Sequence, residues 1–214
     1  MKRHDLVFVC LTAWQHMLET HGDLAGDPLV AGWVDSGWPL IGRRSLCNEA
    51  QGVALGLPLP PFAGKRRLAF LLQPAEILSI TPPPALDFAG QAAPPAWQPA
   101  LEALGELASQ HSLEVRVFGS LAWRALTGLD YLTASSDLDV LLHIRRDTDL
   151  QRLAADVAAI ETAAPMRLDG EFVRNDGAAV NWREIRAGAR ELLVKTVGGV
   201  EMLDTRLFSG GVSS

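Results

Sequence analysis

The sequence of 214 residues has little cysteine and no long apolar run. Its 2 cysteines, Cys10 and Cys47, do not have CxxC spacing, so we expect buried free thiols rather than a metal or redox site. No apolar stretch reaches the roughly 20 residues that a membrane helix needs. We therefore expect a cytoplasmic protein without a membrane partner. The 5 histidines lack metal-ligand spacing, which argues against a zinc site.

Several common functional motifs are also missing. The sequence has no GxSxG, P-loop or GxGxxG motif, which argues against hydrolase, Walker-type NTPase and Rossmann functions. The net charge of −6, from 19 basic and 25 acidic residues, argues against nucleic acid as a partner. Local basic clusters remain at Arg43-Arg44 and Lys65–Arg67. Hydrophobic residues make up 48% of the chain, which indicates a globular protein.

The chain divides into three regions by composition. Residues 1–80 hold short apolar runs separated by turn residues, which predicts a small, mostly β N-terminal module. The predicted strands there are Leu6–Leu11, Gly52–Leu59 and Arg67–Leu72. Residues 81–96 lie in a stretch rich in proline, which cannot form a central strand or a continuous helix, so we expect a linker. Residues 97–214 form the third region and show helical spacing from the start.

The third region alternates between helical and strand patterns, which is typical of an α/β or α+β fold. Apolar residues recur every three or four positions in the predicted helices and form short runs in the predicted strands. In chain order, the prediction is helix Trp97–His111, strand Glu114–Phe118, helix Ser120–Thr127, strand Leu138–Ile144, helix Asp147–Ala163, strand Met166–Val173, a helix within Asn181–Arg190, and a hairpin of Leu192–Thr196 with Val200–Leu203.

Three acidic residues of this region have the pattern of a metal site. Asp137 and Asp139 alternate with apolar residues, so their side chains point to the same face of a strand. Asp169 lies on the next predicted strand and can supply a third carboxylate from alongside; the alternative is a turn residue next to Gly170. Carboxylate oxygens suit Mg²⁺, and a two-metal site can clamp both oxygens of a phosphoryl transfer. We therefore predict Mg²⁺ or Mn²⁺ at Asp137, Asp139 and Asp169.

A Gly-Ser turn precedes these carboxylates. Gly119 allows close approach of a phosphate to the backbone, and Ser120 supplies a hydroxyl at a helix start, where the helix dipole favours an anion. A Gly-Ser pair alone is an ordinary turn, and an Asp-x-Asp alone is often a solvated edge. Their combination, in the order strand, Gly-Ser, helix, loop and strand, is more specific. It indicates phosphoryl transfer.

Four basic residues are candidates for contacts with substrate phosphates. Lys195 lies in an apolar strand pattern, where an unpaired ammonium group is costly to bury; alternatively, its head group extends to the surface. Arg183, beside Trp182, can bind substrate, stack on the indole or pair with Glu184. Arg43 and Arg44 can bind phosphate, meet a protein partner or form a solvated pair.

The Gly119-Ser120 turn, the Asp137-x-Asp139 pair and Asp169 resemble the DNA polymerase β-type nucleotidyltransferase superfamily. The resemblance implies a mixed sheet with flanking helices over residues 97–214 and a nucleotidyltransferase activity. This chain departs from the superfamily in one respect. The 16 residues between Ser120 and Asp137 make the loop Gly128–Ser136 longer than usual.

A closer resemblance extends over nearly the whole chain. The segments that carry it are RHDL at 3–6, PLIGRR at 39–44, GLPLPP at 56–61, FGSLAWRALTGLDYL with SSDLDVLL over 118–142, LDGEF at 168–172, AVNWRE at 179–184 and LLVKT at 192–196. In this order they resemble the malonate decarboxylase holo-acyl-carrier-protein synthase family, the phosphoribosyl-dephospho-CoA transferases. The resemblance implies transfer of a prosthetic group from 2′-(5″-triphosphoribosyl)-3′-dephospho-CoA to a serine of the malonate decarboxylase acyl carrier protein, with release of pyrophosphate.

The resemblance also implies roles for individual residues. Asp137 and Asp139 would hold Mg²⁺ on the triphosphate, and Asp169 would complete the second metal site and help to deprotonate the serine. Gly119 and Ser120 would hold the leaving phosphates. The clusters Arg43-Arg44 and Lys65–Arg67 would receive an acidic carrier protein.

Two other functions are compatible with the residues. One is a nucleotidyltransferase that moves a nucleoside monophosphate from an ordinary nucleoside triphosphate to a small molecule or a protein. The other is a non-catalytic partner-binding module, such as an antitoxin. Transfer from ordinary nucleoside triphosphates would favour the first, and a lack of Mg²⁺ or Mn²⁺ binding would favour the second.

Overall fold

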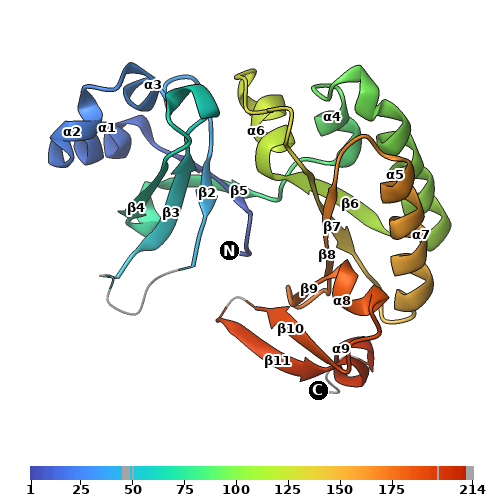
Figure 1. The fold of residues 1–214 in the computed structure, drawn as a ribbon. Helices are drawn as coiled ribbons and strands as arrows, with labels where there is room; N and C mark the ends of the chain where they lie inside the picture. The colour runs from blue at the N-terminus through green and yellow to red at the C-terminus, as the bar shows by residue number, and fades with distance from the viewer. Residues whose placement is uncertain (45–48, 50, 197, 211–214) are drawn as a thin grey trace. The chain divides into compact units, whose positions relative to one another are not determined.

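The computed structural model describes residues 1–44, 49, 51–196 and 198–210, so that Cys47 lies outside the described residues. The chain forms two compact units, Met1–Pro83 and Pro84–Ser214 (Figure 1). Cys10 is a free thiol, as predicted, but its side chain is half-buried rather than buried. No helix in the described part of the chain is both long and apolar enough to span a membrane.

The first unit contains an antiparallel five-stranded sheet with the order β4-β3-β2-β1-β5. The strands are β1 (Leu6–Val9), β2 (Leu40–Gly42), β3 (Val53–Pro58), β4 (Arg67–Leu72) and β5 (Ile77–Thr81). The helices are α1 (Leu11–Thr20), α2 (Gly22–Ala25) and α3 (Pro28–Ala31), with 3-10 turns η1 (Pro61–Ala63) and η2 (Pro74–Glu76). The unit is therefore richer in helix than the predicted, mostly β module.

Two of its elements differ from the prediction. The apolar run that starts at Leu6 ends as a strand at Val9, and α1 follows directly; its buried residues include Trp14, Met17 and Leu18, which share one helix face. Trp14 also donates a 3.1 Å hydrogen bond from Nε1 to the carbonyl of Val30. Strand β5 lies between Pro74 and Pro82 but contains no proline, and it occupies an edge of the sheet beside β1.

The second unit contains a mixed six-stranded sheet with the order β11-β10-β9-β8-β7-β6. Only β7 and β8 run parallel; the other neighbours are antiparallel. The strands are β6 (Glu114–Phe118), β7 (Leu138–His143), β8 (Leu168–Val173), β9 (Ala179–Asn181), β10 (Glu191–Lys195) and β11 (Val200–Asp204). The helices are α4 (Leu86–Gly90), α5 (Gln98–His111), α6 (Gly119–Thr127), α7 (Leu150–Ala163), α8 (Trp182–Arg186) and α9 (Thr205–Gly210), with the 3-10 turn η3 (Pro95–Trp97). This α+β architecture confirms the predicted fold class.

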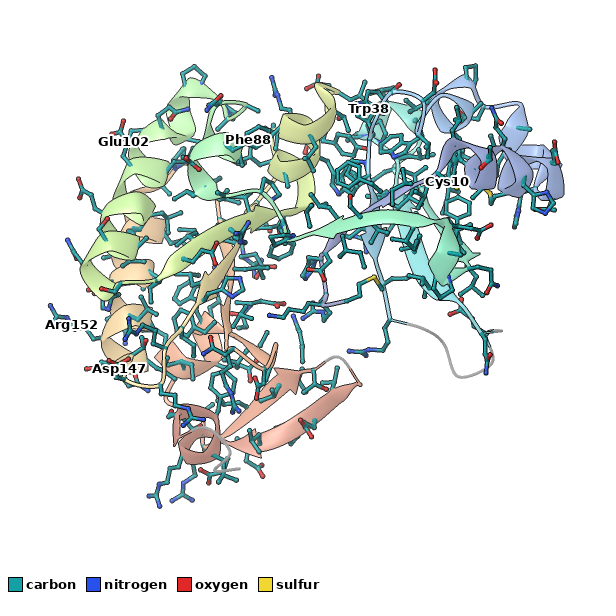
Figure 2. All side chains as sticks on the ribbon, turned by 180° about the vertical axis from the view of Figure 1, so that it is seen from behind. Cys10, Trp38, Phe88, Glu102, Asp147 and Arg152 are labelled. Atoms are coloured by element: carbon teal, nitrogen blue, oxygen red, sulfur yellow. The ribbon has the colours of Figure 1, made fainter. Side chains whose placement is uncertain are left out.

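The helices pack on one face of this sheet. Alternate strand residues, such as Val117, Val140 and Phe172, form one apolar core with Leu104 of α5 and Leu153 of α7. Figure 1 shows α5 and α7 along one side of the sheet. Their polar residues point outward, as Figure 2 shows for Glu102 and Arg152. The alternating residues of the opposite face therefore lie outside this core, and the candidate carboxylates are among them.

The proline-rich stretch is divided between the two units. Residues 81–83 belong to the first unit, and residues 84–96 belong to the second. The Val117 N–H donates to the Pro84 carbonyl at 2.9 Å, and Ala85 forms a bridge with Arg116. Short helix α4 then packs into the core through Ala89. These contacts tie residues 84–96 to the second unit as part of its fold.

Candidate active site

Three strands of the second unit place one residue each in a row across the sheet face opposite the main core, which is called the open face below, although Leu141, Val173 and Ala179 form a small buried cluster on it. Phe118 of β6 is the register partner of Asp139 of β7, which is the register partner of Asp169 of β8. Because β7 and β8 run parallel, these two carboxylates point from adjacent strands to the same face of the sheet. Asp137 precedes β7, which begins at Leu138, so it lies at the entry to the strand rather than within it. The structure thus brings Asp139 and Asp169 together on adjacent strands, as the sequence predicts. Asp137 lies just outside β7.

The Gly119-Ser120 turn lies against Asp139. Gly119 has φ +65°, and a Cβ atom built there would lie 2.6 Å from Cγ of Asp139 and closer still to Oδ2. Only glycine avoids both the strained backbone and this overlap. Helix α6 spans Gly119–Thr127, and Gly128, which has a φ of +72°, is its C-terminal stop. The Ser120 N–H donates to the Asp139 carboxylate.

The environment of Asp139 favours its neutral form. Burial raises its pKa, and the charges of Asp169, Asp137 and Glu171 raise it further, to about 7. The hydrogen bond from the Ser120 N–H opposes this rise, but it does not compensate for it. The row therefore carries an excess of negative charge that a cation would relieve.

A second row of polar side chains lies next to the carboxylates. Glu171 of β8 pairs in register with Asn181 of β9, and both are on the open face. Nδ2 of Asn181 donates to Oδ1 of Asp169 at 3.0 Å. Nζ of Lys195, on β10, donates to Oε1 of Glu171 at 2.6 Å. The predicted residue Lys195 therefore lies on the same face as the carboxylates, with Glu171 as its partner.

Arg183 supports the start of β8. Its Nη1 donates to the Leu168 carbonyl at 2.9 Å, and its Nη2 pairs with Oε1 of Glu161, which also accepts the Leu168 N–H at 2.8 Å. The guanidinium group lies 4.4 Å from the ring centroid of Trp182. Of the alternatives that the sequence left open for Arg183, the structure shows stacking on the Trp182 indole, and the ion-pair partner is Glu161 rather than Glu184. Arg183 and Glu161 thus fix the backbone immediately before Asp169.

Arg43 and Arg44 belong to the first unit. Arg43 forms a double ion pair with Glu49 and donates from Nε to the Leu55 carbonyl at 3.1 Å. Its guanidinium group therefore connects the end of β2 to β3 and to Glu49 within the first unit. Arg44 is exposed.

No group of three or more His, Cys, Asp or Glu residues within residues 1–44, 49, 51–196 and 198–210 is arranged so that it could hold a metal ion. A divalent ion bound by all of Asp137, Asp139 and Asp169 would thus require a change of at least one side-chain conformation. The chemistry of the donors still suits Mg²⁺, because they are carboxylates and because Asp139 lacks a neutralising charge.

The sequence prediction did not include two members of this site. Glu171 lies two positions from Asp169, and this spacing alone would have placed both on one strand face. Asn181 lies beside Asp169 only because β9 folds back antiparallel to β8. No local pattern in the sequence reveals that pairing.

The loop between α6 and β7 is anchored by an aromatic pair. Tyr131 is buried and stacks on Trp123 of α6, with ring centroids 6.0 Å apart. Burial also raises the pKa of Tyr131 well above its usual value. Trp123 is itself buried and is a core residue. This anchored loop leads into Asp137, the residue just before β7.

Comparison with known proteins identifies similar sequences over nearly the whole chain. Residues 2–83 match the family model of the phosphoribosyl-dephospho-CoA transferase MdcG N-terminal domain, and residues 85–206 match that of the C-terminal domain. A phosphoribosyl-dephospho-CoA transferase of Bradyrhizobium diazoefficiens is 56% identical over 211 residues, which cover 99% of this chain and 93% of the relative.

More distant relatives carry the same name. The protein from Xanthomonas campestris pv. campestris (strain 8004) is 38% identical over 208 residues, 96% of each chain. The protein from Pseudomonas putida is 32% identical over 168 residues, which cover 78% of this chain and 79% of the relative. No solved structure matches significantly.

Proposed function

The chain is a transferase that belongs to the phosphoribosyl-dephospho-CoA transferase MdcG family, and from this premise we propose the reaction that it catalyses. It transfers the 2′-(5″-phosphoribosyl)-3′-dephospho-CoA group from the triphosphoribosyl precursor to a serine of the malonate decarboxylase acyl carrier protein. The serine oxygen forms a bond to the α-phosphorus, the bond from this phosphorus to the β-phosphate oxygen breaks, and pyrophosphate leaves.

The observation that carries this proposal is the contact between the Gly119-Ser120 turn and Asp139, which is the register partner of Asp169. Phosphoryl transfer depends on positioning and on neutralising charge more than on covalent catalysis. The α6 N-terminus, next to Asp139, is a suitable place for the leaving phosphates. Lys195, on the same face, would add a positive charge to them.

Asp169 is the residue that we assign to the incoming serine. The Asn181 amide holds its Oδ1 atom, and Arg183 holds the backbone of the preceding residue, so the carboxylate is well fixed. Its other oxygen would accept the serine proton. Asp137, Asp139 and Asp169 would hold Mg²⁺, which when bound supplies Lewis-acid stabilisation of the phosphate charge.

The test is a transfer assay with the purified carrier subunit, the triphosphoribosyl precursor and Mg²⁺, read by the mass of the carrier. We expect Asp139→Asn and Asp169→Asn to lower the rate by roughly 10³-fold or more, because each removes an acceptor needed in the transition state. Asp130→Asn is the matched control, since Asp130 is exposed in the preceding loop. Full activity of both variants would refute the assignment. Robust transfer from ordinary nucleoside triphosphates instead would identify a different donor.

A further inference from the structure

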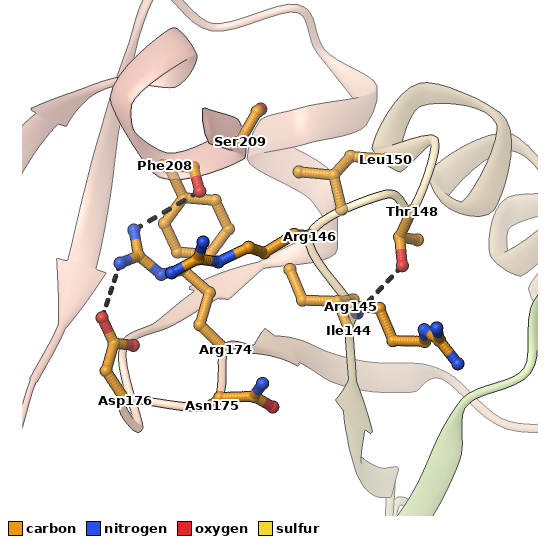
Figure 3. Close-up of a pocket in the computed structure, with 10 residues that line it drawn as sticks. All are labelled: Ile144, Arg145, Arg146, Thr148, Leu150, Arg174, Asn175, Asp176, Phe208 and Ser209. Carbon is orange, nitrogen blue, oxygen red and sulfur yellow. Dashed lines mark hydrogen bonds and ion pairs between the residues drawn. The ribbon is translucent and has the colours of Figure 1, made fainter. Parts of the chain in front are cut away.

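The second unit has a cavity of about 260 Å³ beyond the ends of the parallel strands β7 and β8 (Figure 3). Ile144 follows β7 directly, and Arg174 follows β8. Ligands of α/β proteins commonly bind at the C-terminal ends of parallel strands. The carboxylate row lies at the opposite ends of the same two strands, so the cavity is separate from the site described above.

The cavity has an apolar floor and a basic rim. Ile144, Leu150 and Phe208 are buried and belong to the main core of the unit. Arg146 and Arg174 lie on the rim. This combination fits a ligand that has both an anionic group and an organic part.

The Arg174 guanidinium group is held in place by three contacts. Nη2 is 2.5 Å from Oδ2 of Asp176, Nη1 donates to the Phe208 carbonyl at 3.4 Å, and Cζ lies 5.4 Å from the centroid of the Phe208 ring. Its side chain is only 13% exposed. Arg174 is therefore a fixed charge, which Asp176 neutralises in part.

Arg146 brings a second positive charge to the same place. Its side chain extends toward the Arg174 guanidinium group in Figure 3, whereas Arg145 points away and pairs with Asp147 at 3.4 Å. Arg146 is exposed, and it has no ion-pair partner among the residues that the structure describes. Two neighbouring guanidinium groups repel each other, and a phosphate between them would relieve the repulsion through charge-assisted hydrogen bonds.

Thr148 adds a neutral donor. Its Oγ1 atom accepts a hydrogen bond from the Arg145 N–H at 3.0 Å, which fixes the oxygen and leaves its own O–H to donate. The cavity therefore offers the guanidinium groups of Arg146 and Arg174 and a hydroxyl to an anion.

We infer that this cavity binds the diphosphate of the coenzyme-type donor, an inference that rests on the proposed function. The five residue-to-residue steps from Asp139 to Ile144 span about 16 Å along the strand direction. In the donor, two ribose rings separate the reactive phosphorus from the diphosphate that joins adenosine to pantetheine. Ile144 lies on the core face of the sheet and Asp139 on the opposite face. A donor with its triphosphate at the carboxylate row would therefore run along β7 and pass around the C-terminal end of this strand to reach Arg146 with its diphosphate.

The experiment uses the full chain and dephospho-CoA as a probe in isothermal titration calorimetry, with adenosine as the ligand that lacks the diphosphate. We expect Arg146→Gln to weaken binding of dephospho-CoA by about tenfold and to leave adenosine unaffected. Arg152→Gln is the matched control, because it removes the same charge from the first turn of α7, where its side chain points away from the unit (Figure 2). In the transfer assay, Arg146→Gln should raise KM for the donor and leave kcat and KM for the carrier unchanged.

The outcomes separate this inference from the proposed function. Normal transfer by the parent chain, with the same donor KM in Arg146→Gln, would overturn the inference and leave the function intact. Equal weakening by Arg146→Gln and Arg152→Gln would also overturn it, since it would show a general effect of charge. Specific weakening of dephospho-CoA binding in a chain that shows no transfer would support the cavity and refute the function.

Discussion

Lys195 donates a 2.6 Å hydrogen bond from Nζ to Oε1 of Glu171, and this pair joins an ammonium group that is 33% exposed to a carboxylate that is 5% exposed. Glu171 is the only buried charged residue in the described part of the chain. A buried carboxylate without a partner is far more costly than one that is paired. Glu171 therefore keeps Lys195 on the open face, next to the row of Asp139 and Asp169.

Replacement of Lys195 by methionine should destabilise the chain through Glu171. We expect a loss of about 2–4 kcal/mol in the free energy of unfolding, because the carboxylate stays buried without its ammonium partner. Urea unfolding measures this loss. The double variant Lys195→Met with Glu171→Gln should recover most of it, since the glutamine carries no charge. Additive effects of the two substitutions would contradict the coupling.

Asp139 should make the stability of the chain depend on pH. Its pKa is about 7 in the folded chain, whereas the ordinary value is 3.8. The folded chain thus holds this proton more tightly, so the contribution is fully present below about pH 4 and is lost as the pH rises through about 7. Asp139→Asn should therefore be more stable than the parent at pH 8, on the order of 1–3 kcal/mol, and show no such gain at pH 4.

Mg²⁺ should stabilise the chain through the ionised form of Asp139, whereas the metal-free chain is more stable with this carboxyl group neutral. A metal binds the ionised carboxylate, so added Mg²⁺ should raise the melting temperature of the parent more at pH 8 than at pH 5.5. Asp139→Asn should lose this response, and Asp130→Asn should keep it. An Mg²⁺ response of equal size at both pH values would argue against Asp139 as a ligand.

The glycines at the two ends of α6 form a matched pair. Gly119 and Gly128 both have positive φ, +65° and +72°, but only at Gly119 would a Cβ atom overlap another residue. Gly128→Ala should thus cost roughly 1–2 kcal/mol of backbone strain and leave transfer intact. Gly119→Ala carries the same strain and also displaces Asp139, so we expect transfer to fall by at least about 10²-fold.

Melting temperatures and transfer rates of both alanine variants measure this difference. Similar rates in the two would show that the contact between Gly119 and Asp139 has no part in catalysis. Loss of folding in Gly119→Ala alone would be recognised by circular dichroism. In that case, Gly119→Ala combined with Asp139→Gly, which removes the overlapping side chain, should restore the fold without restoring transfer.

The segment from β6 to β8 was predictable because its signals are local. Apolar residues alternate with polar ones in β6 and at the start of β7, and Gly128 marks the end of α6. Other features depend on contacts that are distant in sequence. Arg183 pairs with Glu161, 22 positions away, rather than with the neighbouring Glu184. Short-range patterns contain no information about such partners.

The first unit was harder to predict because a strand and a helix adjoin. The apolar run from Leu6 continues into α1, and only the three- and four-residue spacing of Trp14, Met17 and Leu18 marks the change of period. Strand β5 was missed because prolines flank it closely. Those prolines lie outside Ile77–Thr81, and an edge strand tolerates proline nearby.

The basic cluster Lys65–Arg67 should contribute to recognition of the proposed acidic carrier. All three side chains are exposed, and Arg66 is ion-paired with Asp27 at 2.9 Å. We therefore expect Lys65→Glu with Arg67→Glu to raise KM for the carrier by about tenfold and to leave KM for the donor unchanged, because like charges would then meet at the docking surface. The effect should shrink as the salt concentration rises, since exposed charges are screened.

The control for this prediction is Arg152→Glu with Arg190→Glu, which makes the same change of net charge at exposed positions of the second unit. It should leave KM for the carrier near the parent value. An equal rise in both double variants would indicate that only the net charge matters, because long-range repulsion does not depend on which face carries the charge. An unchanged carrier KM in the Lys65 and Arg67 variant would exclude this cluster from the docking surface. A rise confined to that variant would instead assign the first unit a direct part in receiving the carrier.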